Sequence, residues 1–146
     1  MYYENGSPTK YTSTDGKTVL ESADDVAAKV MGGNWIMPTQ SQLSELIDET
    51  KTTNEWVTKY NDITGLNGMT FTGKGDYSDN AIFIPAAGLR NSDSLFSVGS
   101  SGYVWSSSLD TDSPNKAVWL KFGSNSTSVS AGNRCNGYSV RGVIPK

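Results

Sequence analysis

Residues 32–48, GGNWIMPTQSQLSELID, are the stretch of this 146-residue chain that decides the fold. The pair Gly32-Gly33 is typical of a helix end, and the apolar plug Asn34–Pro38 follows it. Thr39 and Gln42 have the spacing of a capping box, in which each side chain satisfies the other residue's backbone N–H. An apolar stripe at helical spacing comes next, formed by Leu43, Leu46 and Ile47. The stretch therefore predicts one helix that ends and a second that begins.

The helix that ends at the glycine pair is predicted over residues 23–31, with apolar residues on one face. These residues are Ala23, Val26, Ala27, Val30 and Met31. Ser22 or Ala23 is expected near its start, where Asp24-Asp25 would complement the positive end of the helix dipole. Before it, an extended lead-in is expected to turn at Asn5-Gly6 and Asp15-Gly16.

Downstream of Glu49-Thr50, where the second helix is expected to end, the pattern changes to short strands. The predicted strands are residues 55–60, 68–72, 81–85, 103–106, 117–122, 127–130 and 138–143. The apolar run Ala81–Pro85 is expected to be fully buried. Two early helices followed by many strands indicate an α+β domain, and no repeat divides residues 1–146 into further domains.

Composition excludes several classes of function. The chain has no histidine and one cysteine, so Ser-His-Asp and Cys-His catalysis, histidine-based zinc sites and internal disulfides are all excluded. The net charge is −3 and Lys and Arg do not cluster, so no nucleic-acid partner is expected. No apolar run approaches the roughly 20 residues that span a bilayer, so membrane insertion by this domain is not expected.

Two motifs resemble ligand-binding loops. Residues 68–74 match the GxxxxGK pattern of phosphate-binding loops, but Gly75 replaces the required Ser or Thr and no helix pattern follows, so a β-hairpin is favoured. Residues 110–115 begin like a calcium loop, but the sixth position is not Gly and Lys121 replaces the bidentate Glu. A polar turn is favoured there, no cofactor is expected, and a structural calcium site that uses backbone carbonyls is left open.

Aromatic residues could form a core or a binding surface. Trp35 and Trp105 are expected in the core because their neighbours are apolar. In the strand 117–122, period two places Val118, Leu120 and Phe122 on one side and Ala117, Trp119 and Lys121 on the other. Trp119 is therefore expected on the more exposed face, where a Trp is a favoured binding anchor. Arg134 and Arg141 are surface residues in the simplest interpretation. Alternatively, Arg141 is buried and its five donors tie loops together.

Four stretches together resemble C-type-lectin-fold proteins related to the formylglycine-generating-enzyme group, especially a gut Bacteroides and phage branch. These are GGNWIMPTQSQLSELID (32–48), AIFIPAAGLR (81–90), GSSGYVWSSS (99–108) and GYSVRGVI (137–144). Ile36 departs from the pattern, since this branch has Arg there. The resemblance implies a C-type lectin fold, with two helices packed on a twisted, mostly antiparallel sheet, long loops, and termini that meet in the sheet.

Enzymes of the wider group use paired cysteines or a histidine-based iron site, which this chain lacks. The resemblance therefore implies a non-catalytic ligand-binding module. Several proteins of this branch are similar to targets of diversity-generating retroelements, in which mutagenesis at adenines rewrites a C-terminal region. Residues 103–143 are the corresponding candidate here, since AAC and AAT codons can become Ser, Asn, Thr, Gly, Ala or Cys. An ordinary polar hairpin is the alternative.

The expected ligand-binding residues combine aromatic anchors with small or charged polar side chains, as in antibody paratopes. They are Tyr103, Asp110, Asp112, Lys116, Trp119, Lys121, Ser124, Asn125, Ser126, Asn133, Cys135, Asn136 and Tyr138. The expected partner is a protein or glycan on another cell surface, and the expected location is a bacterial surface or phage particle. Two alternatives are a fimbrial, fibre-tip or lipoprotein domain that packs on a neighbouring subunit, and an enzyme that uses carboxylates or Ser-Lys chemistry.

Overall fold

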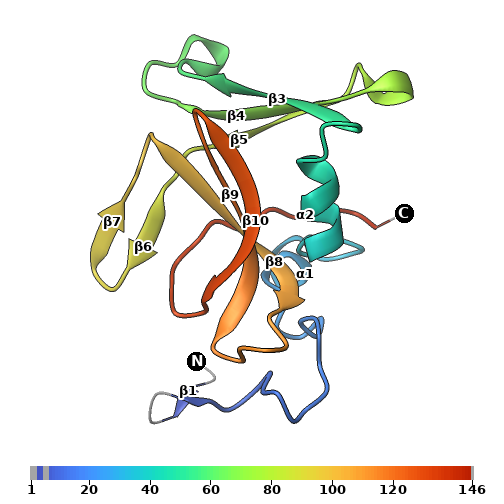
Figure 1. Ribbon diagram of the computed structural model, residues 1–146, viewed down its shortest axis with the longest axis vertical. Coiled ribbons are helices and arrows are strands. Elements are labelled where there is room, and N and C mark those ends of the chain that lie inside the picture. Colours follow the sequence, from blue (N-terminus) through green and yellow to red (C-terminus); the bar gives the residue numbers. More distant parts are fainter. Residues whose placement is uncertain (1–2, 5–6, 146) are drawn as a thin grey trace.

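A computed structural model describes residues 3–4 and 7–145, so the turn expected at Asn5-Gly6 lies outside the described residues. The structure is α+β, as predicted (Figure 1). Its helices are α1 (Val26–Met31) and α2 (Gln40–Leu46), with 3-10 turns η1 (Tyr60–Asp62) and η2 (Gly75–Tyr77). Its strands are β1 (Tyr3–Glu4), β2 (Ser7–Pro8), β3 (Thr52–Val57), β4 (Gly68–Gly73), β5 (Ala81–Pro85), β6 (Leu89–Asn91), β7 (Ser94–Phe96), β8 (Ser101–Leu109), β9 (Lys116–Gly123) and β10 (Ser126–Asn133).

The strands form small antiparallel sheets arranged around a central one. The central sheet has the order β10-β9-β8, and a second three-stranded sheet has the order β3-β4-β5. β6 and β7 form a separate hairpin, as do β1 and β2. Figure 1 shows the central sheet running from the β3-β4-β5 sheet at one end to the N-terminal segment at the other. The β6-β7 hairpin lies to one side of it and α2 to the other.

The main core lies where α2 and the two three-stranded sheets meet. Its buried residues are Leu43, Met69, Phe71, Ile84, Val104, Leu120 and Phe122. Phe71 and Phe122 join the two sheets in an edge-to-face contact, with ring centroids 6.1 Å apart. A Cβ atom at Gly102 would overlap the Phe122 ring, so β8 needs a glycine at this position.

The capping box predicted for α2 is confirmed. The Thr39 side chain accepts from the Gln42 backbone N–H at 3.3 Å, and the Gln42 side chain accepts from the Thr39 N–H at 2.9 Å. Leu43 is buried, and Leu46 and Ile47 pack against the core cluster. Capping and an apolar stripe together therefore fix the start and the orientation of α2.

The start predicted for α1 is wrong, because Asp25 is its N-cap rather than Ser22 or Ala23. The buried Asp25 carboxylate accepts from the Ala28 N–H at 3.0 Å and from the Met37 N–H at 2.8 Å. One side chain thus caps α1 and holds the linker that leads to α2. The predicted end is confirmed, since Gly32 follows the helix with a φ of 67°, which favours glycine.

The two helices differ in how much they bury. The expectation that both pack on a sheet holds for α2, whereas α1 buries only Ala27. Val26, Val30 and Met31 are 47%, 79% and 50% exposed. The apolar face predicted for α1 is therefore mostly a surface of the chain.

The three serines that follow Trp105 form an irregular part of β8. The pairing register with β9 shifts between Trp105 and Leu109. The Ser106 hydroxyl donates to the Val118 carbonyl at 2.9 Å, and the Ser108 hydroxyl accepts from the Gln40 N–H at 2.9 Å. The WSSS sequence therefore joins the central sheet to the first turn of α2 through side-chain hydrogen bonds.

A segment after the N-terminal lead-in and a segment near the C-terminus both pair with β8. The first described strand, β1, lies in a separate sheet with β2, so the expectation that the termini meet in the sheet is not confirmed. Leu20 donates its N–H to the Ser107 carbonyl at 2.8 Å. Ser139 donates to the Tyr103 carbonyl at 3.0 Å and accepts from the Trp105 N–H at 2.9 Å. β8 thus anchors the lead-in and the C-terminal segment together.

The C-terminal strand predicted over residues 138–143 does not form as a continuous strand. Its backbone instead makes isolated bridges whose partners change along the segment. Gly137 pairs with Arg90, Ser139 with Val104, and Val143 with Ile36. Because each partner belongs to a different part of the chain, no regular ladder develops.

The strands before β6 differ from the predictions in detail. β3 begins and ends three residues earlier than predicted, because its pairing with β4 runs from Thr52 to Val57. The expectation that β5 is fully buried is wrong, since β5 is an edge strand with only Ile84 buried. The hairpin predicted around Gly68–Gly73 is confirmed by the antiparallel pairing of β4 with β5.

Candidate ligand-binding face

The central sheet has an inner face toward the core and an outer face away from it. On β9, Val118, Leu120 and Phe122 are buried, so the predicted period-two arrangement is confirmed. The register then places a defined set of residues on the opposite side, because Tyr103 and Ser128 flank Lys121 while Trp105 and Ser130 flank Trp119. We call this set the outer face: Tyr103, Trp105, Ala117, Trp119, Lys121, Ser128, Ser130 and Gly132.

Four aromatic rings cluster on the outer face. Tyr138 comes from the C-terminal segment and packs on three rings of β8 and β9. Its ring centroid lies 4.3 Å from Trp105, 5.0 Å from Tyr103 and 5.9 Å from Trp119. Tyr103 and Trp119 also touch, with centroids 5.8 Å apart. We call these four residues the aromatic cluster, and contacts of this kind stabilise by about 0.5–1.5 kcal/mol per pair.

The cluster changes the role expected for two of the predicted anchors. Tyr103 is only 9% exposed, so the expectation of an exposed anchor is wrong for this residue. Trp119 is half-buried rather than exposed, while Trp35 and Trp105, expected in the core, are also half-buried. For Tyr103 and Trp119 the physical reason is Tyr138, whose segment pairs with β8 at Ser139 and covers the neighbouring rings. Trp105 is only half-buried because it lies opposite Trp119 on the outer face.

The Trp119 indole has an unusual environment. Its Nε1 atom is buried, and no acceptor reaches it within the part of the chain that the structure describes. A buried N–H without a partner costs about 1–3 kcal/mol. The indole packs directly over Gly132, where an added Cβ would overlap Nε1 and lie 3.1 Å from Cδ1. The cluster therefore holds this ring at an energetic cost and only because residue 132 has no side chain.

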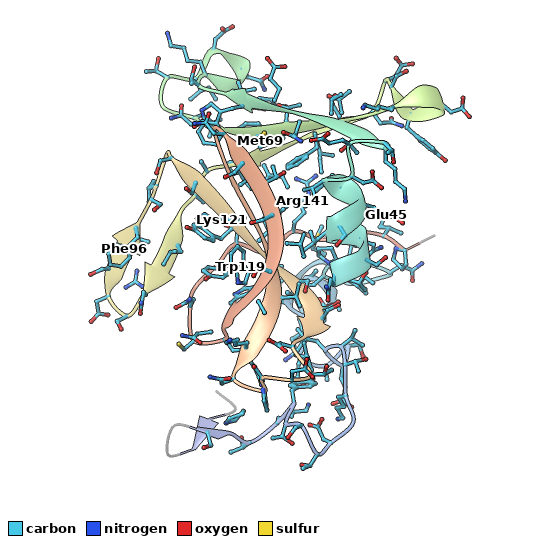
Figure 2. All side chains as sticks on the ribbon, viewed as in Figure 1. Glu45, Met69, Phe96, Trp119, Lys121 and Arg141 are labelled. Atoms are coloured by element: carbon cyan, nitrogen blue, oxygen red, sulfur yellow. The ribbon has the colours of Figure 1, made fainter. Side chains whose placement is uncertain are left out.

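Lys121 contributes a positive charge to the outer face. Its ammonium lies 5.7 Å from the centroid of the Tyr103 ring, within cation–π range. Figure 2 shows Lys121 and Trp119 side by side along the central strands. Ser128 and Ser130, on the neighbouring strand, are exposed. Solvent therefore reaches hydroxyl groups, an amine and the uncovered parts of the half-buried Trp105, Trp119 and Tyr138 rings.

Tyr138 is perturbed by its position over the sheet. Burial raises the pKa of the Tyr138 phenol above its usual value, and the Asn136 side chain, which donates to the phenol oxygen at 2.9 Å, opposes the rise. Tyr103 and Cys135 nearby raise this pKa further. The phenol is therefore held in its neutral form, as expected for a ring whose main function is packing.

Two groups of predicted residues lie at opposite ends of the β9-β10 hairpin. Ser124, Asn125 and Ser126 are exposed at the tight turn. Asn133 and Cys135 are exposed at the other end, where Lys116 pairs with Asn133. The strand between them spans about 23 Å at the usual rise per residue. The predicted residues therefore form a long surface with the aromatic cluster at its middle rather than a single pocket.

Asp110 and Asp112 belong to the β8-β9 connection. The Asp110 carboxylate accepts from the backbone N–H groups of Asp112 and Ser113, both at 3.1 Å, which is the polar turn favoured from the sequence. No group of three or more His, Cys, Asp or Glu side chains comes together among the described residues. Within the same residues, no helix is long and apolar enough to cross a membrane.

Arg134 connects loops through guanidinium hydrogen bonds, the role that the sequence suggested as an alternative for Arg141. Its guanidinium donates to the carbonyls of Pro114 at 2.6 Å, Tyr11 at 3.1 Å and Lys10 at 3.1 Å. Arg141 is exposed, so its buried alternative is wrong. Sequence reasoning missed the role of Arg134 because its partners lie up to 124 residues away.

Comparison with known proteins found no relative of this chain. No family model, no curated protein and no solved structure matches the chain. The α+β class therefore rests on the structure itself.

Proposed function

We propose that this chain is a non-catalytic ligand-binding module of C-type lectin fold that displays an interchangeable C-terminal surface. The surface consists of the exposed part of the outer face together with both ends of the β9-β10 hairpin. Its ligand is a protein or glycan on another cell surface, which implies display on a bacterial surface or phage particle. The observation that carries the proposal is the alternation along the two strands: β9 alternates buried apolar residues with half-buried ones, and β10 alternates exposed polar residues with half-buried ones.

This alternation makes the surface tolerant of change. In β10, Ser126, Ser128 and Ser130 are exposed, while Val129 between them packs against the core cluster. Substitutions at exposed positions without special contacts usually alter stability by no more than about 0.5 kcal/mol. The frame can therefore stay folded while its exposed side chains vary.

The resemblance to retroelement targets fits the same positions. Exposed residues between 103 and 143 include Ser, Asn and Cys, which adenine-directed mutagenesis of Asn codons can produce. The solitary Cys135 is exposed in a loop and is free, so packing does not require it. The genomic test is a near-copy of the DNA that encodes residues 103–143, differing mainly at adenines, beside a reverse transcriptase gene. A neighbourhood without such a copy contradicts diversification but not binding.

Binding itself is tested with a panel of immobilised glycans and cell-surface proteins. A triple alanine variant at Lys121, Asn125 and Asn133 removes side chains from the middle and both ends of the surface. Its matched control replaces Lys29, Asn54 and Asn80, which are exposed elsewhere. We expect the first variant to lose any ligand that the unmodified chain binds and the control to keep it. Equal binding by both variants means that the assigned face is wrong.

A structural role is the second candidate, because apolar side chains are exposed away from the outer face. On the β6-β7 hairpin and just after it, Leu95, Phe96 and Val98 are 63%, 50% and 61% exposed. Figure 2 shows Phe96 projecting from the side of the molecule. A fimbrial or fibre-tip subunit would cover such residues with a neighbour. Sedimentation of the isolated chain separates the two functions, since a structural subunit would assemble and a binding module would stay monomeric.

A further inference from the structure

We propose that residue 132 is a specificity-determining position: glycine there keeps the Trp119 indole in the aromatic cluster, and any side chain there turns the indole outward as a ligand anchor. This inference rests on the proposed function, because it assigns two states to the same surface. It concerns one residue pair across β9 and β10.

The Trp119 indole packs directly against the backbone of β10 at residue 132. An added Cβ at residue 132 would overlap Nε1, and would lie 3.1 Å from Cδ1 and 3.4 Å from Cε2 of the same ring. The overlap with Nε1 must be relieved, whereas the Cδ1 contact is tight and the Cε2 contact is ordinary. Because the indole is a rigid bicycle, the whole ring has to move to relieve the overlap. Because the strands are joined by a continuous ladder from Ser126 to Asn133, the backbone is less free to move than the side chain.

The Nε1–H of the Trp119 indole is buried. In the cluster this donor has no acceptor within the described residues, whereas an exposed indole would donate to water or to a ligand. Leaving the cluster thus restores a hydrogen bond that partly offsets the lost ring contacts with Tyr103 and Tyr138. The inward state is the native one only while nothing at position 132 opposes it.

The neighbours of Trp119 leave room for the outward state. Ser130 lies directly opposite it on β10, and Ser128 lies opposite the adjacent Lys121. Both serines are small and exposed. An indole that turns outward would therefore stand above the serines beside the Lys121 amine and present a flat apolar surface with an N–H donor.

The two states fit different classes of ligand. With glycine, the surface presents exposed hydroxyl groups and the Lys121 ammonium while the Trp119 indole is half-buried, which suits a polar or acidic protein surface. With a side chain at residue 132, an exposed indole suits the apolar face of a sugar ring or a cationic side chain, which pack well on aromatic rings. A single substitution would thus change the kind of ligand rather than only its affinity.

The indole placement is tested by NMR on protein labelled with ¹⁵N-tryptophan, in which Trp119→Phe assigns the Trp119 signal. We expect Gly132→Ser to shift the Trp119 indole signal and to speed its hydrogen exchange by roughly tenfold or more. The matched control is Gly123→Ser, where the nearest atoms to an added Cβ are 3.3 and 3.7 Å away. A Trp119 signal that stays protected and unshifted in Gly132→Ser overturns the proposal.

A second variant covers the case in which Gly132→Ser loses its fold. We expect Trp119→Leu to relieve the clash, so that the double variant is more stable than Gly132→Ser alone in urea denaturation. If the double variant is destabilised by the sum of the two single effects, the two sites are independent and the proposal is overturned.

The ligand class is tested on the panel of immobilised glycans and cell-surface proteins described above. We expect Gly132→Ser to gain glycan ligands that the unmodified chain does not bind, and to lose them when Trp119 is also replaced by Ala. An unchanged profile with an outward indole overturns the assignment of specificity to residue 132. If neither chain binds anything on the panel, the proposed function fails, and the NMR result still decides where the indole lies.

Discussion

The two faces of the β8-β9-β10 sheet use alternate residues of the same strands for opposite purposes. On the inner face, Val104, Leu120 and Phe122 are 1%, 0% and 0% exposed and join α2 to the neighbouring sheet. On the outer face, Tyr138 of the C-terminal segment covers Tyr103, which is buried, and Trp105 and Trp119, which are half-buried, while serines face the solvent. The difference teaches that a period-two pattern can separate the residues that stabilise a fold from those available for recognition.

Substitutions on the inner face should have the largest effect on the free energy of unfolding. We expect Phe122→Ala to lower the free energy of unfolding by about 3–5 kcal/mol, because it removes a fully buried ring from the contact between sheets. Guanidinium denaturation measures this change, with Phe96→Ala on the exposed hairpin as the control. A loss below about 1 kcal/mol would mean that the inner face does not form the core.

A substitution in the aromatic cluster should change stability by an amount between the effects at the inner face and at the exposed positions of the outer face. We expect Tyr138→Ala to cost about 1–3 kcal/mol, since the half-buried ring contacts three others. Denaturation gives the magnitude, and near-ultraviolet circular dichroism reports the loss of ring packing. A spectrum that does not change would contradict the cluster even if stability falls.

Alkaline pH should weaken the same cluster by a smaller amount. Burial raises the pKa of Tyr138 in the folded chain. The stability that the neutral phenol contributes is therefore fully present below the unfolded pKa of about 10, and it is lost as pH rises through the folded pKa. We expect stability between about pH 9 and pH 12 to fall less steeply in Tyr138→Phe than in the unmodified chain. Tyr11 also has a raised pKa but is present in both proteins, so the difference isolates Tyr138. Identical slopes would contradict the burial of the phenol.

Substitutions at exposed positions of the outer face should have the smallest effect on the free energy of unfolding. We expect Ser128→Tyr to change the free energy of unfolding by no more than about 0.5 kcal/mol, because the side chain points to solvent. The inner-face change Val129→Ser, at the next residue, is the matched comparison and should cost more. Equal losses for the two variants would remove the distinction between the faces.

Sequence patterns predicted the features that depend on neighbouring residues. The capping box at Thr39 and the alternation around Leu120 are confirmed, because each is set by residues within a few positions. The α+β class followed from the order of such local patterns. The finer lectin assignment and the ligand-binding role stay predictions.

The features that were missed depend on distant parts of the chain. Tyr103 is buried by Tyr138, which lies 35 residues (138 − 103) further along the chain. Arg134 binds carbonyls of the lead-in, and α1 stays exposed because nothing in the described chain covers Val30. No periodicity of the local sequence encodes such contacts.

The central claim, that a rigid frame carries an interchangeable surface, is tested most directly by comparing two displayed libraries for protease resistance. One library randomises Ser124, Asn125, Ser126, Ser128, Ser130 and Asn133. The other randomises Val104, Val118, Leu120, Val129 and Phe122. We expect most members of the first library to resist cleavage as the unmodified chain does, and few members of the second. Similar resistant fractions in the two libraries would contradict the claim.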